Sequence, residues 1–197
     1  MKETLLAERL AFFRAWLFNP QGVAAIAPSS QALAKLITSE ITSETGLVVE
    51  FGPGTGIFTD ALISRGIKER QLVLIEHDEN FAKKLKHLYK DAQIICMDAS
   101  LLKQEFITNK DRVGAIVSGL PMLFFPKYKI IRILENSFNL LGFNGALYQF
   151  TYGLSCPIPI SILDELGLDA EKIGSTFLNI PPASVYRVYR RPDASTP

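Results

Sequence analysis

The sequence is poor in cysteine, in histidine and in net charge. Its 197 residues include two cysteines and two histidines. Two cysteines are too few for a disulfide framework or a four-cysteine zinc site. The 21 lysines and arginines are balanced by 20 aspartates and glutamates, which leaves a net charge of +1. This balance does not favour a large nucleic-acid footprint, because such footprints normally require a strongly basic domain.

Long apolar runs are also missing. No apolar stretch reaches the ~18 residues that a membrane-spanning helix needs, and no signal peptide with a small-residue cleavage site is evident. We therefore expect a cytoplasmic protein that is either free in solution or peripherally associated with the inner face of the cell membrane. Hydrophobic residues make up 48% of the chain, which is enough for a sizeable core in one domain.

Short apolar runs alternate with helical patterns along the chain. Strands are predicted at residues 47–51, 71–76, 93–97, 113–117, 146–152, 177–180 and 185–189. Helices are predicted at residues 58–64, 79–89 and 128–141, with Asp78 as an N-cap and a turn at Asn144-Gly145. Cys96 falls within a predicted buried strand, so we expect it to fill a core position. The alternation indicates a parallel sheet with helices on both faces.

Three glycines at alternate positions follow the first predicted strand. Residues 50–56 are Glu-Phe-Gly-Pro-Gly-Thr-Gly, which makes the pattern acid-x-G-x-G-x-G. Glycine adopts positive φ and leaves room for a ligand, and the following helix offers unpaired N–H groups. This arrangement is typical of a strand end that holds a nucleoside-type cofactor. A dinucleotide fingerprint would need a glycine at position 57, which is Ile57.

Two further acids lie at the ends of the next two predicted strands. Glu76 ends the second strand, where a carboxylate can accept both hydrogens of a ribose diol. Asp98 ends the third strand. His77 is a candidate neighbour of the ribose, and a partly exposed structural histidine is the alternative. Because the ends of parallel strands share one edge of the sheet, these acids are predicted to border the glycine turn.

These features resemble motif I and its companion acids in the class I S-adenosylmethionine-dependent methyltransferases. The resemblance implies an α/β, Rossmann-like fold, with a seven-stranded, mostly parallel sheet whose last strand is antiparallel, plus N-terminal helices. It also implies S-adenosylmethionine as cofactor, with Glu50 at its methionine end and Asp98 at its adenine. No metal is required. The cofactor-binding residues implied are Ser29, Ser30, Glu50, Gly52, Gly54, Thr55, Gly56, Glu76, His77, Asp98, Ala99 and Ser118.

The segment after the fourth predicted strand bears on catalysis. Ser118-Gly119-Leu120-Pro121-Met122 resembles the [D/N/S]-x-x-P motif of amino-group methyltransferases. The resemblance implies that Ser118 and Pro121 help to orient an attacking nitrogen. Methyl transfer is an in-line displacement, so catalysis depends mainly on positioning and desolvation. The alternative is a proline-punctuated strand end followed by core aromatics.

Four flanking segments resemble the bacterial phospholipid N-methyltransferases, which methylate phosphatidylethanolamine stepwise toward phosphatidylcholine. They are residues 26–30, 118–126, 151–153 and 179–183. The resemblance, which covers roughly residues 12–190, implies that Ser29 and Ser30 border the methionine end and that Tyr152 lines the substrate pocket. One alternative is an enzyme like the ribosomal RNA adenine N6-dimethyltransferases, although this chain lacks their Asn-Leu-Pro-aromatic motif. Others are a different small-molecule or protein methyltransferase and a non-catalytic cofactor-binding subunit.

The N-terminal region is predicted to be helical. Its first 18 residues place leucines, phenylalanines and Trp16 on a broad helical face. Such a helix can lie in a membrane interface or pack on the domain's own core. We expect three regions: an N-terminal helical segment (1–45) that contacts the membrane and acts as a lid, a methyltransferase domain (46–191) and a frayed tail (192–197). The expected partner is a phospholipid at an anionic membrane surface, with no nucleic acid.

Overall fold

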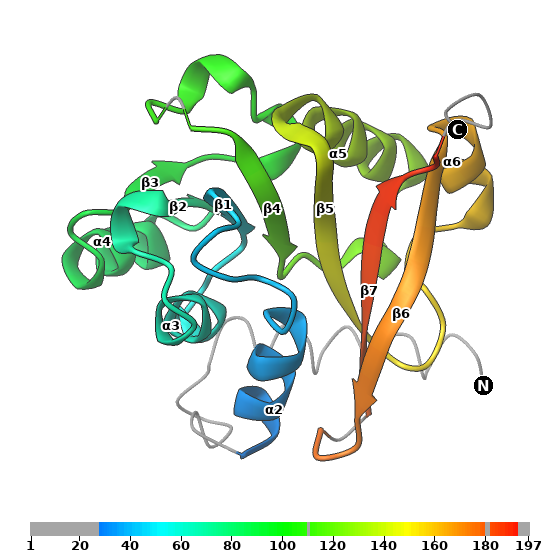
Figure 1. Ribbon diagram of the computed structural model, residues 1–197, viewed down its shortest axis with the longest axis horizontal. Coiled ribbons are helices and arrows are strands. Elements are labelled where there is room, and N and C mark those ends of the chain that lie inside the picture. The colour runs from blue at the N-terminus through cyan, green and yellow to red at the C-terminus, as the bar shows by residue number, and fades with distance from the viewer. Residues whose placement is uncertain (1–27, 110, 180–181, 193–197) are drawn as a thin grey trace.

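The fold is one seven-stranded sheet with helices on both faces (Figure 1). The computed structural model describes residues 28–109, 111–179 and 182–192. The strands lie in the order β3-β2-β1-β4-β5-β7-β6. Their bounds are β1 Leu47–Phe51, β2 Leu72–Glu76, β3 Gln93–Cys96, β4 Val113–Ser118, β5 Leu141–Tyr152, β6 Leu168–Thr176 and β7 Ala183–Arg190.

Among these strands β7 runs against the others. It pairs antiparallel with both β5 and β6, whereas β1, β2, β3, β4 and β5 pair in parallel. In Figure 1 the arrowheads of β4 and β6 point to the bottom of the view and that of β7 points to the top. This topology confirms the predicted class I methyltransferase sheet. It also places the carboxyl ends of β1 to β6 at one edge, called here the carboxyl edge, and their amino ends at the opposite, amino edge.

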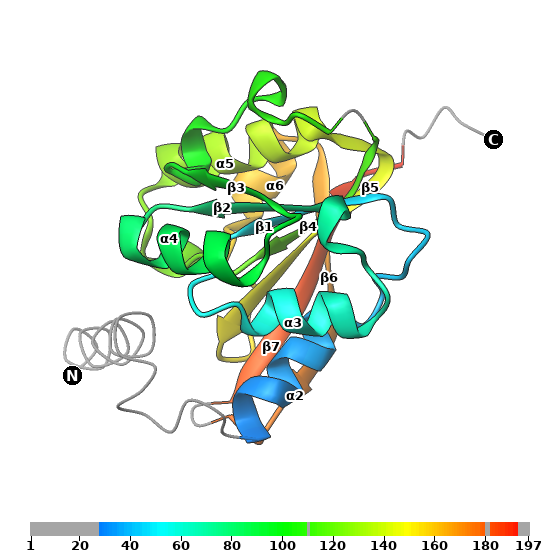
Figure 2. The same ribbon diagram turned by 90° about the vertical axis from the view of Figure 1, so that its left-hand side faces the viewer.

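The helices divide between the two faces of the sheet (Figure 2). The helices α5 and α6 cover one face, and α2, α3 and α4 cover the other. Short 3-10 turns lie in the connections between the described elements. The bounds are α2 Pro28–Ile37, α3 Ile57–Ser64, η1 Glu69–Gln71, α4 Glu79–Leu88, η2 Ala99–Leu101, η3 Gln104–Phe106, η4 Met122–Phe124, α5 Lys127–Leu140 and α6 Ile160–Glu165. Asp78 caps α4 as predicted, because its carboxylate accepts hydrogen bonds from the amides of Asn80 and Phe81.

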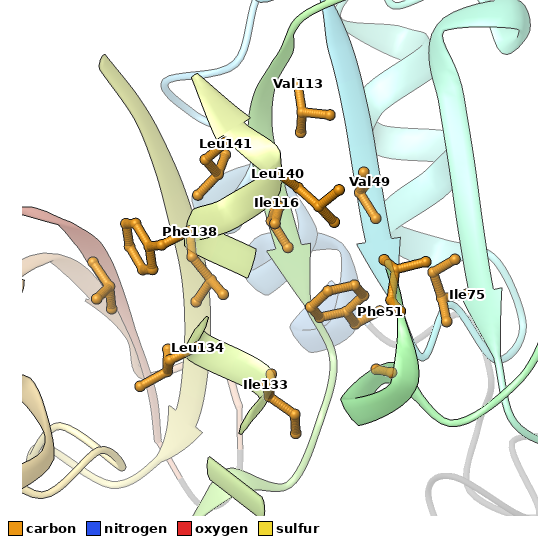
Figure 3. Packing of buried hydrophobic residues seen from close by; sticks show 14 of the residues in the cluster. Val49, Phe51, Ile75, Val113, Ile116, Ile133, Leu134, Phe138, Leu140 and Leu141 are labelled. Atoms are coloured by element: carbon orange, nitrogen blue, oxygen red, sulfur yellow. The ribbon is translucent and has the colours of Figure 1, made fainter. Parts of the chain in front are cut away.

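The strict alternation of side chains in β1 builds both cores. Val49 and Phe51 pack toward α5, where they meet Ile133 and its neighbours (Figure 3), while Val48 packs toward α2 and α3. All five β1 residues are buried. Burying an aliphatic or aromatic side chain contributes roughly 1.5–3 kcal/mol, so this central strand is fixed firmly in register. The polar exception in it is Glu50.

A predicted turn and a predicted strand in the second half of the chain are wrong. Asn144-Gly145 was predicted as a turn, but both residues lie within β5. A Cβ at Gly145 would come within 2.9 Å of the Leu141 side chain and 3.1 Å of the Gly114 carbonyl. Close packing against β4 therefore requires this glycine. The predicted strand at residues 177–180 is also wrong, because the strand that pairs with β7 is β6 (Leu168–Thr176), and residues 177–179 lie beyond its end.

Cys96 is exposed, which corrects the prediction that it fills a core position. It ends β3, which lies at the edge of the sheet and pairs on one side only, with β2. The residues of β3 are consequently half-buried or exposed along their whole length. An apolar run alone does not distinguish an edge strand from a central one.

Candidate active site

The glycine turn connects β1 to α3 at the carboxyl edge, and its glycines have different roles. A Cβ at Gly56, which has φ +88°, would lie 2.3 Å from the Tyr89 hydroxyl. That hydroxyl donates hydrogen bonds to the Asp60 carboxylate (2.7 Å) and the Gly56 carbonyl (3.2 Å). Gly56 is therefore required by the packing of the protein itself. At Gly54 (φ +56°) a Cβ would meet nothing within 4 Å, so the turn is open there to a ligand.

Glu50 lies beneath this turn and is fully buried. Its Oε2 accepts a hydrogen bond from the Thr59 hydroxyl at 2.7 Å, and its Oε1 has no hydrogen-bond partner among the described residues. Burial raises the pKa of the Glu50 carboxyl to about 8, although the Thr59 hydrogen bond opposes this shift. The carboxyl therefore carries a proton near neutral pH, and it retains an acceptor oxygen that the protein does not use.

Glu76 holds the glycine turn in place. Its carboxylate is only 4% exposed, and its Oε2 accepts a hydrogen bond from the Gly54 amide at 2.9 Å. The other oxygen accepts from the Asp78 amide, also at 2.9 Å. Each carboxylate oxygen retains a second lone pair, which suits a pair of ribose hydroxyls. The neighbouring His77 is exposed, as is Thr55 in the turn itself.

Asp98 follows β3 and caps η2 through a hydrogen bond from the Ser100 amide. Its other oxygen forms an ion pair with Lys129 Nζ at 2.7 Å. Partial burial alone would raise the pKa of Asp98, but the hydrogen bonds from Lys129 and Ser100 and the charge of Lys129 together outweigh it and lower the pKa to about 2. Lys129 Nζ also lies 4.7 Å from the centroid of the Phe125 ring. Sequence reasoning missed Lys129, because a lysine near the start of a helix is ordinarily solvated.

Three observations show that this turn suits the nucleoside cofactor that the sequence predicts. Gly54 leaves open space at the turn, Glu50 Oε1 is a buried acceptor without a partner, and Glu76 and Asp98 follow in the order β2, β3 along the edge. The acceptor at Glu50 suits a ligand ammonium. Ala99, next to Asp98, is buried. Ser29 and Ser30 lie in α2, and their side chains lie outside what the structure describes.

The loop after β4, residues 119–126, lies against the glycine turn. The Gly119 amide donates to the Phe51 carbonyl at 2.8 Å, and a Cβ at Gly119 would come within 2.8 Å of the Gly52 carbonyl oxygen. Ser118 is fully buried at the end of β4, and Pro121 behind it is half-buried. This backbone contact joins the predicted cofactor turn to the predicted acceptor loop, so a change in one displaces the other.

Gln149 fixes the acceptor loop from the neighbouring strand, where it pairs with Ser118 in the register of β4 and β5. Its Nε2 donates to the carbonyls of Leu120 (2.9 Å) and Phe150 (2.7 Å). Its Oε1 is buried without a partner among the described residues. Sequence reasoning missed Gln149. The available signal was a single amide inside the otherwise apolar and aromatic end of a strand.

Tyr152 ends β5 at the same edge. Its ring makes an edge-on contact with Phe150 at 5.5 Å, and Phe150 makes another with Phe58 of α3 at 5.8 Å. Burial raises the pKa of the Tyr152 phenol to about 12, which a hydrogen bond with the Asn179 side chain partly offsets. Asn179 is itself buried, and its Oδ1 has no partner among the described residues. A row of aromatic rings thus connects the helix after the glycine turn to a third acceptor without a partner among the described residues.

A cavity of about 780 Å³ lies at the amino edge, away from all of these groups. Four arginines contribute to its lining. Arg187 pairs with Glu40 and Glu171, and Arg191 pairs with Asp164 and Asp169. The lining also includes Arg190 and Arg112, and Arg190 donates to backbone carbonyls at the end of α5. Most of these cations already have partners, so size alone does not make this cavity the active site.

Comparisons with known proteins show which family the chain belongs to. The model of the ribosomal RNA adenine dimethylase family matches residues 14–131, more than half of the chain. The chain is 32% identical over 113 residues to the ornithine lipid N-methyltransferase of Singulisphaera acidiphila. That match covers 53% of this chain and 57% of the relative, so it spans little more than half of the relative's length.

Solved structures share the fold at low sequence identity. The N-methyltransferase NodS from Bradyrhizobium japonicum, in complex with S-adenosylhomocysteine, superposes with a TM-score of 0.65 at 15% identity and covers 93% of this chain and 98% of its own. A TehB-like S-adenosylmethionine-dependent methyltransferase from Corynebacterium glutamicum gives 0.63 at 17% identity, with 92% and 99% covered. The family match, rather than the shared fold, makes S-adenosylmethionine the cofactor of this protein. The chain belongs to the ribosomal RNA adenine dimethylase family, and it is an S-adenosylmethionine-dependent methyltransferase.

Proposed function

We propose that this methyltransferase acts on the primary amine of a membrane lipid. The specific form of the proposal is stepwise N-methylation of phosphatidylethanolamine toward phosphatidylcholine. The carrying observation is the lack of charged residues in the loops on the acceptor side of the site. The three loops that follow β4, β5 and β6 there, residues 119–126, 153–159 and 177–182, contain no Asp, Glu, Lys or Arg. The similarity to an ornithine lipid N-methyltransferase supports the same class of acceptor.

The proposed chemistry needs a neutral, oriented amine. When bound, the cofactor supplies an electrophilic methyl group. A protonated primary amine has no lone pair, and its pKa in water is about 10.4. Apolar side chains of the acceptor loop, such as Met122 and Phe125, disfavour the charged form of a bound amine and so lower its pKa. In the proposal, the unused acceptor of Asn179 receives an N–H of the amine, and Gln149 holds the Leu120 carbonyl.

RNA adenine methylation is the second candidate, and the family match over residues 14–131 favours it. Two observations count against it. Proteins that bind RNA contact the phosphate backbone with lysines and arginines, which these loops lack. The chain also has Gly119-Leu120-Pro121-Met122 where an asparagine and an aromatic residue would be needed. In the proposal the enzyme is peripherally associated with the inner face of the membrane. Among the described residues no helix is both long and apolar enough to cross a bilayer.

A radiolabelled-methyl assay tests the proposal. The full chain is incubated with labelled S-adenosylmethionine and one of three acceptors: vesicles containing phosphatidylethanolamine, vesicles containing ornithine lipid, or ribosomal RNA. We expect label in phosphatidylethanolamine. Label confined to ornithine lipid would retain lipid N-methylation and reject the specific acceptor, and label confined to RNA would overturn the proposal. The negative control is Gly54→Leu, which fills the open side of the glycine turn.

A further inference from the structure

Exposed apolar side chains gather at the carboxyl edge. The residues Leu123, Leu154, Phe177 and Leu178, called here the apolar rim, are 47%, 60%, 73% and 66% exposed. They belong to the three uncharged loops after β4, β5 and β6. Contiguous exposed apolar side chains on a soluble domain mark a surface that contacts a partner or a membrane.

The three loops lie side by side, because the strands that carry them are neighbours. Tyr152 at the end of β5 and Thr176 at the end of β6 both pair with Ala183 of β7. The Gly153 amide donates to the Pro182 carbonyl at 2.9 Å, which links the second loop to the third. The first loop contacts the glycine turn through Gly119. The strands that carry these loops point toward the bottom of Figure 1, so the rim lies at the same edge of the sheet as the glycine turn.

We propose that the apolar rim inserts into the boundary between headgroups and acyl chains of a phospholipid bilayer, with the carboxyl edge of the sheet facing the membrane. This inference rests on the proposed lipid acceptor, which brings the bilayer to this edge. Leu and Phe side chains without neighbouring charges suit that boundary, as they do in interfacial helices. A nucleic acid would require cations in the same loops. The orientation places the glycine turn near the headgroup amines.

The lack of charge also predicts how the rim responds to salt. Contacts between basic residues and anionic lipid weaken as ionic strength rises, whereas burial of Leu and Phe does not. We expect the rim to bind zwitterionic vesicles, and to bind them about equally at 0.1 M and 1 M salt. Each half-exposed Leu or Phe contributes roughly a fivefold increase in vesicle affinity.

Flotation with phosphatidylcholine vesicles tests the rim directly on the full chain. The rim variant combines Leu123→Ser, Leu154→Ser, Phe177→Ser and Leu178→Ser, all at exposed positions. The matched control combines Leu88→Ser, Phe106→Ser and Phe143→Ser, which are 58%, 42% and 75% exposed away from the carboxyl edge. We expect the rim variant to lose about 100-fold or more in vesicle affinity at both salt concentrations, and the control to stay within twofold of the wild type.

Two results would overturn the inference. One is a rim variant that binds vesicles as the wild type does, or a control that loses as much as the rim variant. The other is evidence that the rim joins two copies of the chain. In that case light scattering would show a dimer for the wild type and a monomer for the rim variant, and flotation would show the same vesicle binding for both. Flotation involves no methyl transfer, so these results would reject only the insertion of the rim into the membrane. Label confined to RNA in the methyl assay would reject the proposed function.

Discussion

The two edges of the sheet differ in how many of their buried polar atoms lack a partner. At the carboxyl edge three buried acceptor oxygens, on Glu50, Gln149 and Asn179, have no partner among the described residues. At the amino edge one buried donor, Arg187 Nε, also lacks a hydrogen-bond partner among the described residues, but the guanidiniums of Arg187 and Arg191 are each paired with two carboxylates. An unused buried acceptor normally costs about 1–3 kcal/mol, so its persistence indicates a site kept for a ligand.

The comparison of the two edges also indicates that cavity volume alone does not identify the functional site. The amino edge holds a cavity of about 780 Å³, but most of the charges around it are neutralised by the protein itself. The carboxyl edge offers an open glycine turn and acceptors that suit a cofactor with a sulfonium and an ammonium group. We therefore assign the cofactor site from buried acceptors that lack a partner, and not from cavity volume.

The largest expected effect comes from a matched pair of glycines, one at each edge. Gly54 (φ +56°) and Gly167 (φ +64°) both have a left-handed backbone, and a Cβ at either would meet nothing within 4 Å. A leucine at either position incurs the same strain of roughly 1–2 kcal/mol. We expect Gly54→Leu to weaken S-adenosylmethionine binding by about 100-fold or more, because the leucine side chain fills the open side of the glycine turn. We expect Gly167→Leu to leave the affinity within twofold of the wild type. Calorimetry measures both affinities, and equal losses in the two variants would contradict this assignment.

Replacing Glu50 should improve stability while it harms cofactor binding. Below pH 4.5 the carboxyl is protonated in both the folded and the unfolded chain. Between pH 4.5 and 8 the unfolded chain ionises while the folded one, with its pKa near 8, retains the proton, so wild-type stability falls as pH rises. Glu50→Gln avoids this loss and should be more stable than the wild type by about 1–3 kcal/mol at pH 8.

The same variant should bind S-adenosylmethionine roughly tenfold more weakly, because a bound ammonium favours the ionised form of the Glu50 carboxyl, and a glutamine cannot ionise. Urea unfolding at pH 4, 6 and 8 measures the stability difference, and calorimetry measures the affinity. A variant that is less stable than the wild type at pH 8, or that binds the cofactor as tightly as the wild type does, would contradict the assignment of Glu50 to the cofactor site.

The smallest effect is expected at the amino edge. Arg187 lies 2.7 Å from Glu171 and 3.4 Å from Glu40, in side chains that are about one-third or more exposed. Arg187→Met should lower stability by about 0.5–1 kcal/mol, with a smaller loss at high salt. Cofactor affinity should not change. A loss of S-adenosylmethionine binding in this variant would show that the two edges are coupled.

The local chemistry of the carboxyl edge was predictable from the sequence, whereas its partners across the fold were not. The glycine turn, Glu50 and Glu76 follow from motif spacing at the ends of buried strands, and their positions agree with that prediction. Lys129 and Gln149 could not be predicted, because each meets its partner only after strands and helices distant in sequence have packed. Contacts between residues that are distant in sequence cannot be predicted from local sequence patterns.

The wrong strand prediction also arises because a local sequence pattern does not show which residues pack together in the fold. The strand β6 mixes charged and small residues and has few apolar ones (Leu-Asp-Ala-Glu-Lys-Ile-Gly-Ser-Thr). This composition is not typical of a strand, so the sequence favours the more apolar residues 177–180. Two of those residues, Phe177 and Leu178, are exposed. Apolar character that serves an outer surface is indistinguishable in sequence from apolar character that serves a core.

Hydrogen–deuterium exchange with and without S-adenosylhomocysteine tests the central claim, that the ligand binds at the carboxyl edge. We predict that the ligand slows exchange in residues 50–56, 76–80, 98–101 and 118–122, which form the glycine turn and the neighbouring strand ends. Exchange in residues 40–46 and 187–192, which line the cavity at the amino edge, should stay unchanged. Protection of the amino-edge segments without protection of the glycine turn would contradict the account.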